Sequence, residues 1–173
     1  NLMIFTNLGV MYRLLVDSIP VGNNTSKGVP VSSLIEFAPG EEVSTIYSIY
    51  RDTDATYVLF ATKNGMIKKT PLEDLTKTKK RSGLPVITFK DNDALANVSL
   101  VKDEELIILT KHGMGIHFNS NEVTPTGRSA MGVKSINLNE DDEVLTCLPI
   151  RNKGDNLAIF TDNGLGKQIK VSE

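Results

Sequence analysis

Basic side chains gather in the polar connections that follow a series of glycine turns. Between Lys63 and Gly83 the chain has seven lysines and arginines against two acidic residues, a local balance of +5. Basic loops and exposed backbone N–H groups bind phosphates without reading base sequence. The pattern predicts either a surface that contacts duplex DNA or a solvated basic loop. The candidate DNA-binding residues are Arg13, Lys27, Lys68, Lys69, Lys77, Lys79, Lys80, Arg81, Arg128, Lys134 and Lys167.

The distribution of charge matters here because the total charge is close to neutral. The chain has 19 basic and 21 acidic residues, a formal net charge of −2. The acidic residues collect in separate turns, at 40–42, 91–93 and 139–142, and in the run 103–105. The chain has no Trp, which argues against the aromatic platforms that bind single strands by stacking.

The residue types that carry catalysis are not arranged for it. His112 and His117 have no partners at metal-ligand spacing, and the stretch 164–167 lacks the earlier glycine of a phosphate-binding loop. Cys147 is the only cysteine, which excludes an internal disulfide and fits a reducing compartment such as the cytoplasm. We expect Cys147 to be a small buried apolar residue. The apolar runs are too short to span a membrane. Together these observations predict a non-enzymatic chain without a metal, a cofactor or a membrane partner.

The elements that position the basic residues repeat along the chain. An apolar run, a Thr, a polar turn with Gly and a second strand recur at residues 2–14, 58–70, 106–118 and 157–169. A second glycine, at Gly28, Gly83 and Gly132, follows each of the first three turn glycines 18 or 19 residues later. Two landmarks in phase indicate a repeat of about fifty residues. The predicted copies are 1–55, 56–104, 105–154 and an incomplete 155–173.

Each copy predicts four short strands. The first two form a hairpin whose Asn-Gly or His-Gly pair favours a two-residue type I′ turn, with positive φ at both central residues; Leu8-Gly9 fits this turn poorly and predicts a different one. Third strands are expected at 29–37, 84–89 and 133–138, and fourth strands at 43–49, 95–101 and 144–150. Residues 71–75 could form one helical turn. Four antiparallel strands per copy predict an all-β fold of propeller-like blades.

Three segments resemble a known family. Residues 58–70 (VLFATKNGMIKKT) resemble the repeat in the C-terminal domain of the A subunit of bacterial DNA gyrase. Residues 124–138 (TPTGRSAMGVKSINL) are close to that family's GR-A-GV-I-L pattern, and residues 26–30 (SKGVP) match the same place in the first copy. The resemblance covers essentially the whole chain. The repeat in the A subunit of topoisomerase IV is similar as well.

The resemblance implies a fold and a function. The fold is a β-pinwheel, a propeller-like partial ring whose neighbouring blades exchange strands. The function is the binding and wrapping of duplex DNA on a basic rim, which supports negative supercoiling by an ATP-dependent type II topoisomerase. The resemblance places the catalytic residues, and the use of ATP and Mg²⁺, in other regions of the parent enzyme. It implies duplex DNA, the rest of the gyrase A subunit, and the gyrase B subunit as partners in the cytoplasm.

One departure from the family keeps alternatives open. Gyrase A subunits carry a basic box of the form QRRGGKG, and the nearest equivalent here is Lys79-Lys80-Arg81-Ser82-Gly83 in the second copy. Either the box lies in a blade outside this chain, as the abrupt start and half-finished fourth copy favour, or the chain is topoisomerase-IV-like. A third interpretation is a propeller that binds proteins through its acidic turns. Such a propeller would bind no DNA even at low salt, which separates it from the other two.

Overall fold

Four β-hairpins recur along the chain, because each copy places a strand-forming run on either side of a tight glycine turn. The structure is a computed structural model that describes residues 1–49, 53–77, 82–152 and 154–171. Each hairpin lies where the repeat predicts it. The pairs are β1 (Leu2–Thr6) with β2 (Val10–Leu14), β4 (Tyr57–Thr62) with β5 (Met66–Pro71), β8 (Glu105–Thr110) with β9 (Gly115–Asn119), and β12 (Asn156–Phe160) with β13 (Gly166–Lys170).

A return strand in each of the first three copies pairs with the first strand of its own hairpin. These strands are β3 (Val43–Ser48), β7 (Leu95–Val101) and β11 (Val144–Ile150), and they pair antiparallel with β1, β4 and β8. Their bounds agree with the predicted fourth strands, with β3 one residue shorter than expected. The register of each pair shifts near the hairpin turn, as at a β-bulge.

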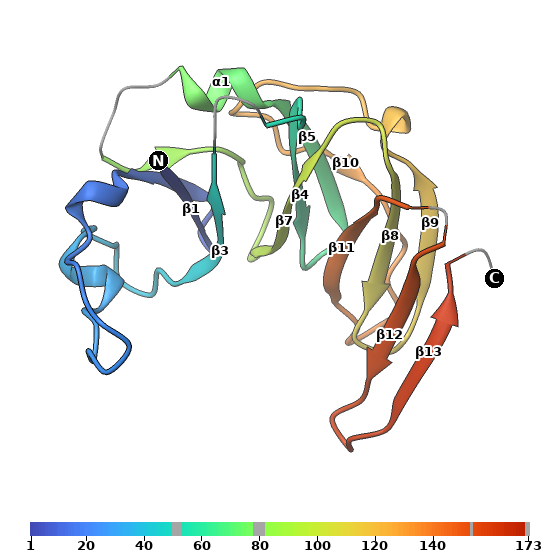
Figure 1. Ribbon diagram of the computed structural model, residues 1–173. Coiled ribbons are helices and arrows are strands. Elements are labelled where there is room, and N and C mark those ends of the chain that lie inside the picture. Colours follow the sequence, from blue (N-terminus) through green and yellow to red (C-terminus); the bar gives the residue numbers. More distant parts are fainter. Residues whose placement is uncertain (50–52, 78–81, 153, 172–173) are drawn as a thin grey trace.

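Neighbouring copies exchange a short strand. β6 (Leu84–Pro85), from the second copy, pairs with β2 of the first, and β10 (Val133–Lys134), from the third copy, pairs with β5 of the second. The sheets therefore have the orders β3-β1-β2-β6, β10-β5-β4-β7, β11-β8-β9 and β12-β13. They follow one another along an arc (Figure 1). This is the partial ring with exchanged strands that the β-pinwheel implies.

The predicted third strands are the weakest part of the prediction. Residues 84–89 and 133–138 contribute only two residues each to a sheet, and residues 29–37 form no strand. Residues 29–37 contain a 3₁₀ turn instead, η2 (Val31–Ser33), which begins after the extended Pro30. β6 and β10 exist because the hairpin of the preceding copy offers an edge, and within this chain residues 29–37 have no preceding hairpin. The expected helical turn is confirmed as α1 (Leu72–Thr76), and two further 3₁₀ turns are η1 (Val16–Ser18) and η3 (Ser120–Glu122).

The hairpin turns differ from the predicted type I′. In each turn only the glycine has a positive φ, between 70° and 82°, so the preceding Asn64, His112 and Asn163 are not left-handed. The N–H of Gly65 donates to the carbonyl of Thr62 at 3.1 Å, which closes a four-residue turn whose last residue is the left-handed glycine. Leu8-Gly9 adopts this turn as well, so the expectation of a turn other than type I′ at this position is confirmed.

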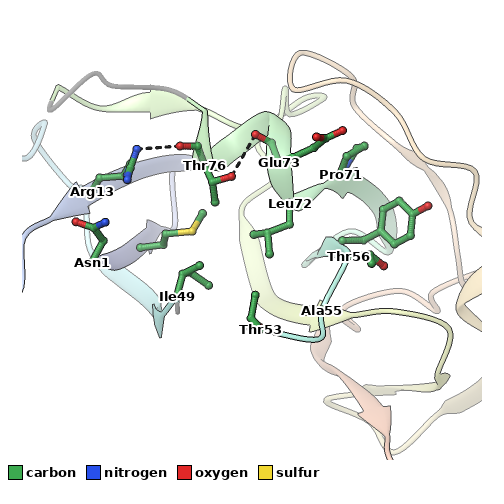
Figure 2. A pocket seen from close by; sticks show the side chains of 12 residues that line it. Asn1, Arg13, Ile49, Thr53, Ala55, Thr56, Pro71, Leu72, Glu73 and Thr76 are labelled. Carbon is green, nitrogen blue, oxygen red and sulfur yellow. Dashed lines mark hydrogen bonds between the residues drawn. The ribbon is translucent and has the colours of Figure 1, made fainter. Parts of the chain in front are cut away.

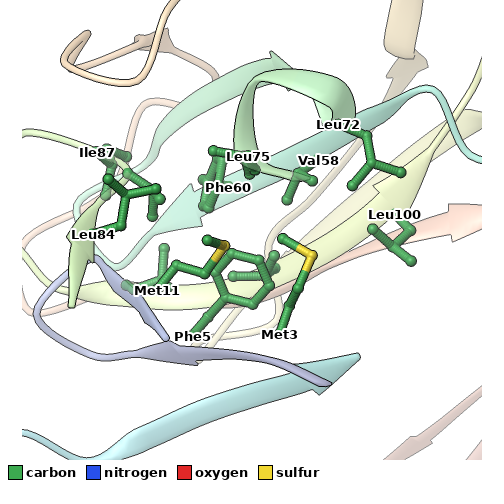
Figure 3. Close-up of a cluster of buried hydrophobic side chains, with 13 residues drawn as sticks. Met3, Phe5, Met11, Val58, Phe60, Leu72, Leu75, Leu84, Ile87 and Leu100 are labelled. Carbon is green, nitrogen blue, oxygen red and sulfur yellow. The ribbon is translucent and has the colours of Figure 1, made fainter. Parts of the chain in front are cut away.

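Two of the hydrophobic cores lie between neighbouring sheets. Val58 and Phe60 of β4 face the first sheet, whereas Leu59 and Ala61 face the third, as the period of two along a strand requires. Figure 3 shows the first core, where residues of β1 and β2 meet residues of β4, α1 and β7. Phe5 packs edge-on against Phe60 with their ring centroids 5.8 Å apart. β4 is thus buried on both faces, and it joins the two cores.

Cys147 belongs to the second core, as expected from the sequence. Its side chain is fully buried on β11, and burial raises the pKa of its thiol to about 12, so it is a protonated apolar group at neutral pH. In the part of the chain that the structure describes, no helix has the length and apolar character needed to cross a membrane.

Candidate nucleic-acid interface

Arg128 and Lys134 lie on the connection that brings the exchanged strand β10 to the second sheet. β10 is the outermost strand of that sheet, and the side chains of Arg128 and Lys134 are both exposed. Lys134 pairs with Met66 of β5, one residue from the hairpin turn of the second copy. The two cations therefore share one connection at an outer sheet edge, where a phosphate backbone can reach them.

Hydrogen bonds to the second copy fix the main chain on either side of Arg128. The hydroxyl of Thr88 donates to the carbonyl of Ser129 at 2.9 Å, and the N–H of Thr88 donates to the carbonyl of Ala130 at 3.3 Å. Gly132 has φ +90°, and a Cβ at this position would lie 2.3 Å from the carbonyl oxygen of Ile67. Only glycine allows the connection to approach β5 so closely, which explains this landmark of the repeat.

Lys68 and Lys69 are not at the surface, which corrects the prediction for these two residues. Their side chains on β5 are 1% and 2% exposed. The ammonium of Lys68 donates to the carbonyls of Val86 and Arg128, at 2.5 and 2.6 Å. The ammonium of Lys69 donates to the carbonyl of Ser120 at 2.6 Å. Both groups are occupied inside the protein and are not available to a phosphate.

Aromatic rings complete the surroundings of the two buried lysines. The ammonium of Lys68 lies 5.5 Å from the centroid of the Phe60 ring, and that of Lys69 lies 4.9 Å from the Tyr57 ring, within the range of cation–π attraction. Burial lowers the pKa of Lys68 to about 8, helped by the positive charge of Arg128 nearby. Burial lowers the pKa of Lys69 as well. Carbonyls and rings stabilise these cations less than water does.

Arg13 hydrogen-bonds to the residue that precedes Lys77, at the C-terminal end of α1. The guanidinium of Arg13, on β2, donates to the carbonyl of Thr76 at 3.0 Å, as Figure 2 shows. An open cavity of about 670 Å³ separates the first hairpin from α1 there. The next residue, Lys77, is exposed and pairs with Glu73 at 2.9 Å, and this carboxylate raises the pKa of Lys77. Arg13 is therefore partly engaged in holding the second copy, whereas Lys77 remains at the surface.

The other predicted contacts are spread along the arc. Lys27 is exposed in the long connection of the first copy, and Lys167 is exposed on β13, the last strand of the chain. Lys79, Lys80 and Arg81 lie outside the described residues. Among the described residues, Arg128 and Lys134 thus share one connection, and Arg13 is hydrogen-bonded to the residue before Lys77.

The acidic turns serve the hairpins rather than a free surface. A carboxylate oxygen of Asp93 accepts from the N–H of Asn64 at 2.9 Å, and one of Asp142 accepts from the N–H of His112 at 3.0 Å. In the first copy the buried carboxylate of Glu41 accepts from the hydroxyls of Thr6 and Tyr12. These acids tie the return strand to the hairpin turn of the same copy. They are therefore poor candidates for recognising a protein partner.

The histidines have ordinary acidic neighbours. The ring of His117 lies 3.4 Å from the carboxylate of Glu105, and that of His112 lies 4.0 Å from Asp142. Among the described residues no three His, Cys, Asp or Glu side chains come close enough to hold a metal ion.

Comparison with known proteins identifies the family. A family model described as the DNA gyrase C-terminal domain, a beta-propeller, matches residues 1–49, 56–102, 104–151 and 155–173. The chain belongs to this family. The curated relatives include the DNA gyrase A subunits of Chlamydia muridarum (36% identical over 176 residues), Lawsonia intracellularis (35% over 172) and Staphylococcus epidermidis (34% over 176). These alignments cover 99–100% of the chain but only 20–21% of each relative.

Solved structures of two related enzymes share the fold. The C-terminal domain of a DNA topoisomerase IV matches with a TM-score of 0.89 and 30% identity, and that of a DNA gyrase A matches with 0.81 and 31%. Each alignment covers 99% of this chain and 53% or 54% of the solved chain. The TM-scores and the identities rank the two enzymes in opposite orders, so the shared fold does not separate them. The curated relatives quoted above are all A subunits of gyrase, which favours gyrase over topoisomerase IV.

Two contributors to the candidate interface were missed by sequence reasoning. Thr88 and Gly132 shape the connection that carries Arg128. Gly132 had a signal, its phase in the repeat, but the sequence did not say what it packs against. Thr88 had none, because its partners Ser129 and Ala130 lie in the next copy.

Proposed function

We propose that this chain binds duplex DNA without sequence preference and bends it along the outer edges of its sheets, as part of the DNA-wrapping domain of a gyrase A subunit. The observation that carries the proposal is the pair Arg128 and Lys134, two exposed cations on one connection that is fixed to a sheet edge. Membership of the DNA gyrase C-terminal domain family supports it.

The arrangement suits contact with phosphates. Each cation that meets a phosphate releases counterions, which gives affinity without base readout. Bending a duplex costs several kcal/mol, and several contacts along a curved surface offset that cost. Arg128 and Lys134, with Lys77, Lys27 and Lys167, are the proposed contacts among the described residues. Lys79, Lys80 and Arg81 stay in the proposal on sequence grounds alone.

The wider role belongs to the whole enzyme. In the proposed parent, wrapping by this domain supports negative supercoiling, and the catalytic residues lie outside this chain, as does the use of ATP and Mg²⁺. Its proposed partners are the remainder of the gyrase A subunit, together with the gyrase B subunit, in the cytoplasm. The proposal includes four copies of the repeat with the predicted boundaries. An interaction propeller is disfavoured because Glu41, Asp93 and Asp142 are occupied within their own blades.

A salt titration of DNA binding tests the proposal. We expect the 173-residue chain to bind a labelled duplex with an affinity, measured by fluorescence anisotropy, that falls steeply with salt. Arg128→Ala and Lys134→Ala should each weaken binding by roughly threefold to tenfold and reduce the log–log salt slope by about 0.9, the value of one phosphate contact. A nicked plasmid that is sealed in the presence of the chain should also change in linking number. Wrapping alters the twist or the writhe of the DNA, and ligation fixes that change.

The matched control is Lys111→Ala. Lys111 is an exposed lysine in the third hairpin turn, and its N–H donates to the carbonyl of Glu143 in an acidic turn. Its replacement removes the same charge from a different part of the molecule, and we expect no change in the salt slope. Absence of binding at low salt would overturn the proposed function. Equal losses for Lys111→Ala and Arg128→Ala would show that only the total charge matters.

A further inference from the structure

Two consecutive lysines on β5 clamp the connection of the third copy at two points. Their side chains leave opposite faces of the strand, as successive residues do. Lys69 holds the carbonyl of Ser120, where the connection begins, and Lys68 holds the carbonyl of Arg128, eight residues further on. Between these points the N–H of Thr126 donates to the carbonyl of Lys69 at 2.8 Å. The connection is therefore attached to β5 before, at and after its crossing.

The first copy contains a counterpart. Arg13 lies four residues after its turn glycine, as Lys69 does, and it donates to the carbonyl of Thr76 in the connection of the second copy. In both places a basic residue on the second hairpin strand holds the main chain of the following copy. This use of a cation is internal, and it differs from the phosphate contact that the sequence pattern favours.

Lys68 is the member of the clamp that touches a proposed DNA contact. We propose that Lys68 is a positioning residue for DNA binding, whose ammonium holds the main chain of Arg128 so that the Arg128 side chain stands out from the sheet edge. The proposal rests on the proposed function, since it takes Arg128 to meet a phosphate. It assigns Lys68 an effect on DNA affinity although the side chain is 1% exposed.

Loss of the Lys68 ammonium would leave two main-chain carbonyls without their charged donor. The ammonium of Lys68 supplies donors to the carbonyls of both Val86 and Arg128. Without it, these oxygens lose a charged donor, and a buried carbonyl without a partner is unfavourable. The simplest relief is for the connection to move outward and hydrate its carbonyl. The direction of the Arg128 side chain would then no longer be fixed. The entropy cost of ordering this side chain on DNA would weaken binding.

A double-mutant cycle on DNA binding tests this. Lys68→Met keeps a flexible apolar chain of similar length and removes the ammonium. We expect it to weaken binding to the labelled duplex by roughly threefold to tenfold and to lower the salt slope by about as much as Arg128→Ala does, near 0.9. The double variant Lys68→Met with Arg128→Ala should bind no more weakly than Arg128→Ala alone. Additive losses would overturn positioning, because they would mean that Lys68 acts independently of Arg128.

A measurement without DNA separates the clamp from the proposed function. In Lys68→Met we expect faster amide hydrogen exchange at Thr88, whose N–H donates to the carbonyl of Ala130, and at Ala130, whose N–H donates to the carbonyl of Gly127 within the connection, with β4 and β7 unchanged. Unchanged exchange at Thr88 and Ala130 would overturn the clamp whatever the DNA results. Faster exchange there, together with an Arg128→Ala variant that binds normally, would leave the clamp standing and reject Arg128 as a contact.

A second variant guards against misfolding of Lys68→Met. Thr88→Val removes the exposed hydroxyl that donates to the carbonyl of Ser129 and leaves the core untouched. It should loosen the same connection from its outer side and weaken DNA binding in the same direction, again without an added effect in the absence of the Arg128 side chain. If neither Lys68→Met nor Thr88→Val changes DNA affinity while Arg128→Ala does, the connection needs no fixing and the proposal is wrong.

Discussion

Lys68 and Lys69 are buried cations whose hydrogen-bond acceptors are carbonyl oxygens rather than carboxylates. A carbonyl dipole compensates a full charge only in part, so burial lowers the pKa of both residues. With a pKa of about 8, Lys68 keeps its proton at neutral pH and loses it in mildly alkaline solution. The buried charge of Lys68 holds the connection of the third copy, and its burial lowers the stability of the folded chain.

The lowered pKa of Lys68 predicts a specific dependence of stability on pH. Between about 8, its pKa in the folded chain, and the ordinary lysine value of 10.5, the unfolded chain binds the proton that the folded chain has lost. The free energy of unfolding of the natural chain should therefore rise with pH in this window, relative to Lys68→Met, by up to about 1.4 kcal/mol per pH unit. Urea unfolding of both chains at several pH values between about 7 and about 10 measures the difference. A difference that stays flat would show that Lys68 titrates normally.

The sequence contains a signal for the burial of these lysines. Once the hairpin turn is placed, its register sets Lys68 opposite Phe60 and Lys69 opposite Leu59. Phe60 and Leu59 lie in an apolar run that the repeat predicts to be core. A lysine opposite a core residue on a central strand pair is a candidate for burial. The exposed Arg128 and Lys134, in contrast, follow from their place in a polar connection.

At the scale of an element, the recurring Thr before each turn has a structural role. The hydroxyl of Thr62 accepts from the N–H of Met66 at 3.1 Å, and Thr6, Thr110 and Thr161 make the same contact in their copies. The side chain thus satisfies a donor on the strand that leaves the turn. A type I′ turn has no need of this Thr, so its recurrence could have warned against that prediction.

Removal of the hydroxyl should weaken the hairpin measurably. Thr62→Val keeps the shape of the side chain and leaves the N–H of Met66 without its acceptor. We expect a loss of about 1 kcal/mol in the free energy of unfolding, measured by urea titration. Thr62→Ser is the control, since it retains the hydroxyl and should keep the hydrogen bond. Equal stability of the Val variant and the natural chain would mean that water replaces the Thr at no cost.

The strands divide by how much of their pairing is local. The hairpins and the return strands β3, β7 and β11 pair within their own copy, and the pattern of apolar residues predicted them closely. β6 and β10 are two residues long and exist only through a neighbouring copy. The apolar residues in 29–37, 84–89 and 133–138 indicate burial, which a segment can have without sheet hydrogen bonds. The exchange itself was implied only by the family resemblance.

At the scale of the whole molecule, stability depends on the contacts between sheets. The first core joins two copies across Phe5 and Phe60, and the second joins β4 to the third copy. A sheet in such an array contacts only its neighbours, so its stability is the sum of its own terms and those of its interfaces. Since β4 faces both cores, the second sheet should be the most protected from unfolding.

A pair of Phe substitutions tests this arrangement. Phe60→Ala empties the centre of the first core, where Phe60 is fully buried, and we expect it to lower the free energy of unfolding by about 3–5 kcal/mol. Phe160→Ala makes the same chemical change at a residue of β12 that is 77% exposed, and its effect should stay within about 0.5 kcal/mol. Urea unfolding measures both. Similar losses for the two variants would contradict a core placed between the first and second sheets.

Because strands are exchanged, the repeating unit of the sequence is not the same as the folded four-stranded sheet. Each four-stranded sheet takes three strands from one repeat and its outer strand from the following one. Loss or gain of one complete repeat, cut at the same point in two successive copies, still leaves each remaining hairpin followed by a segment able to cover its edge. The number of blades can therefore change in a single genetic step without exposing a new internal edge. In a domain built this way, the length of the surface offered to the proposed DNA ligand can change by whole blades.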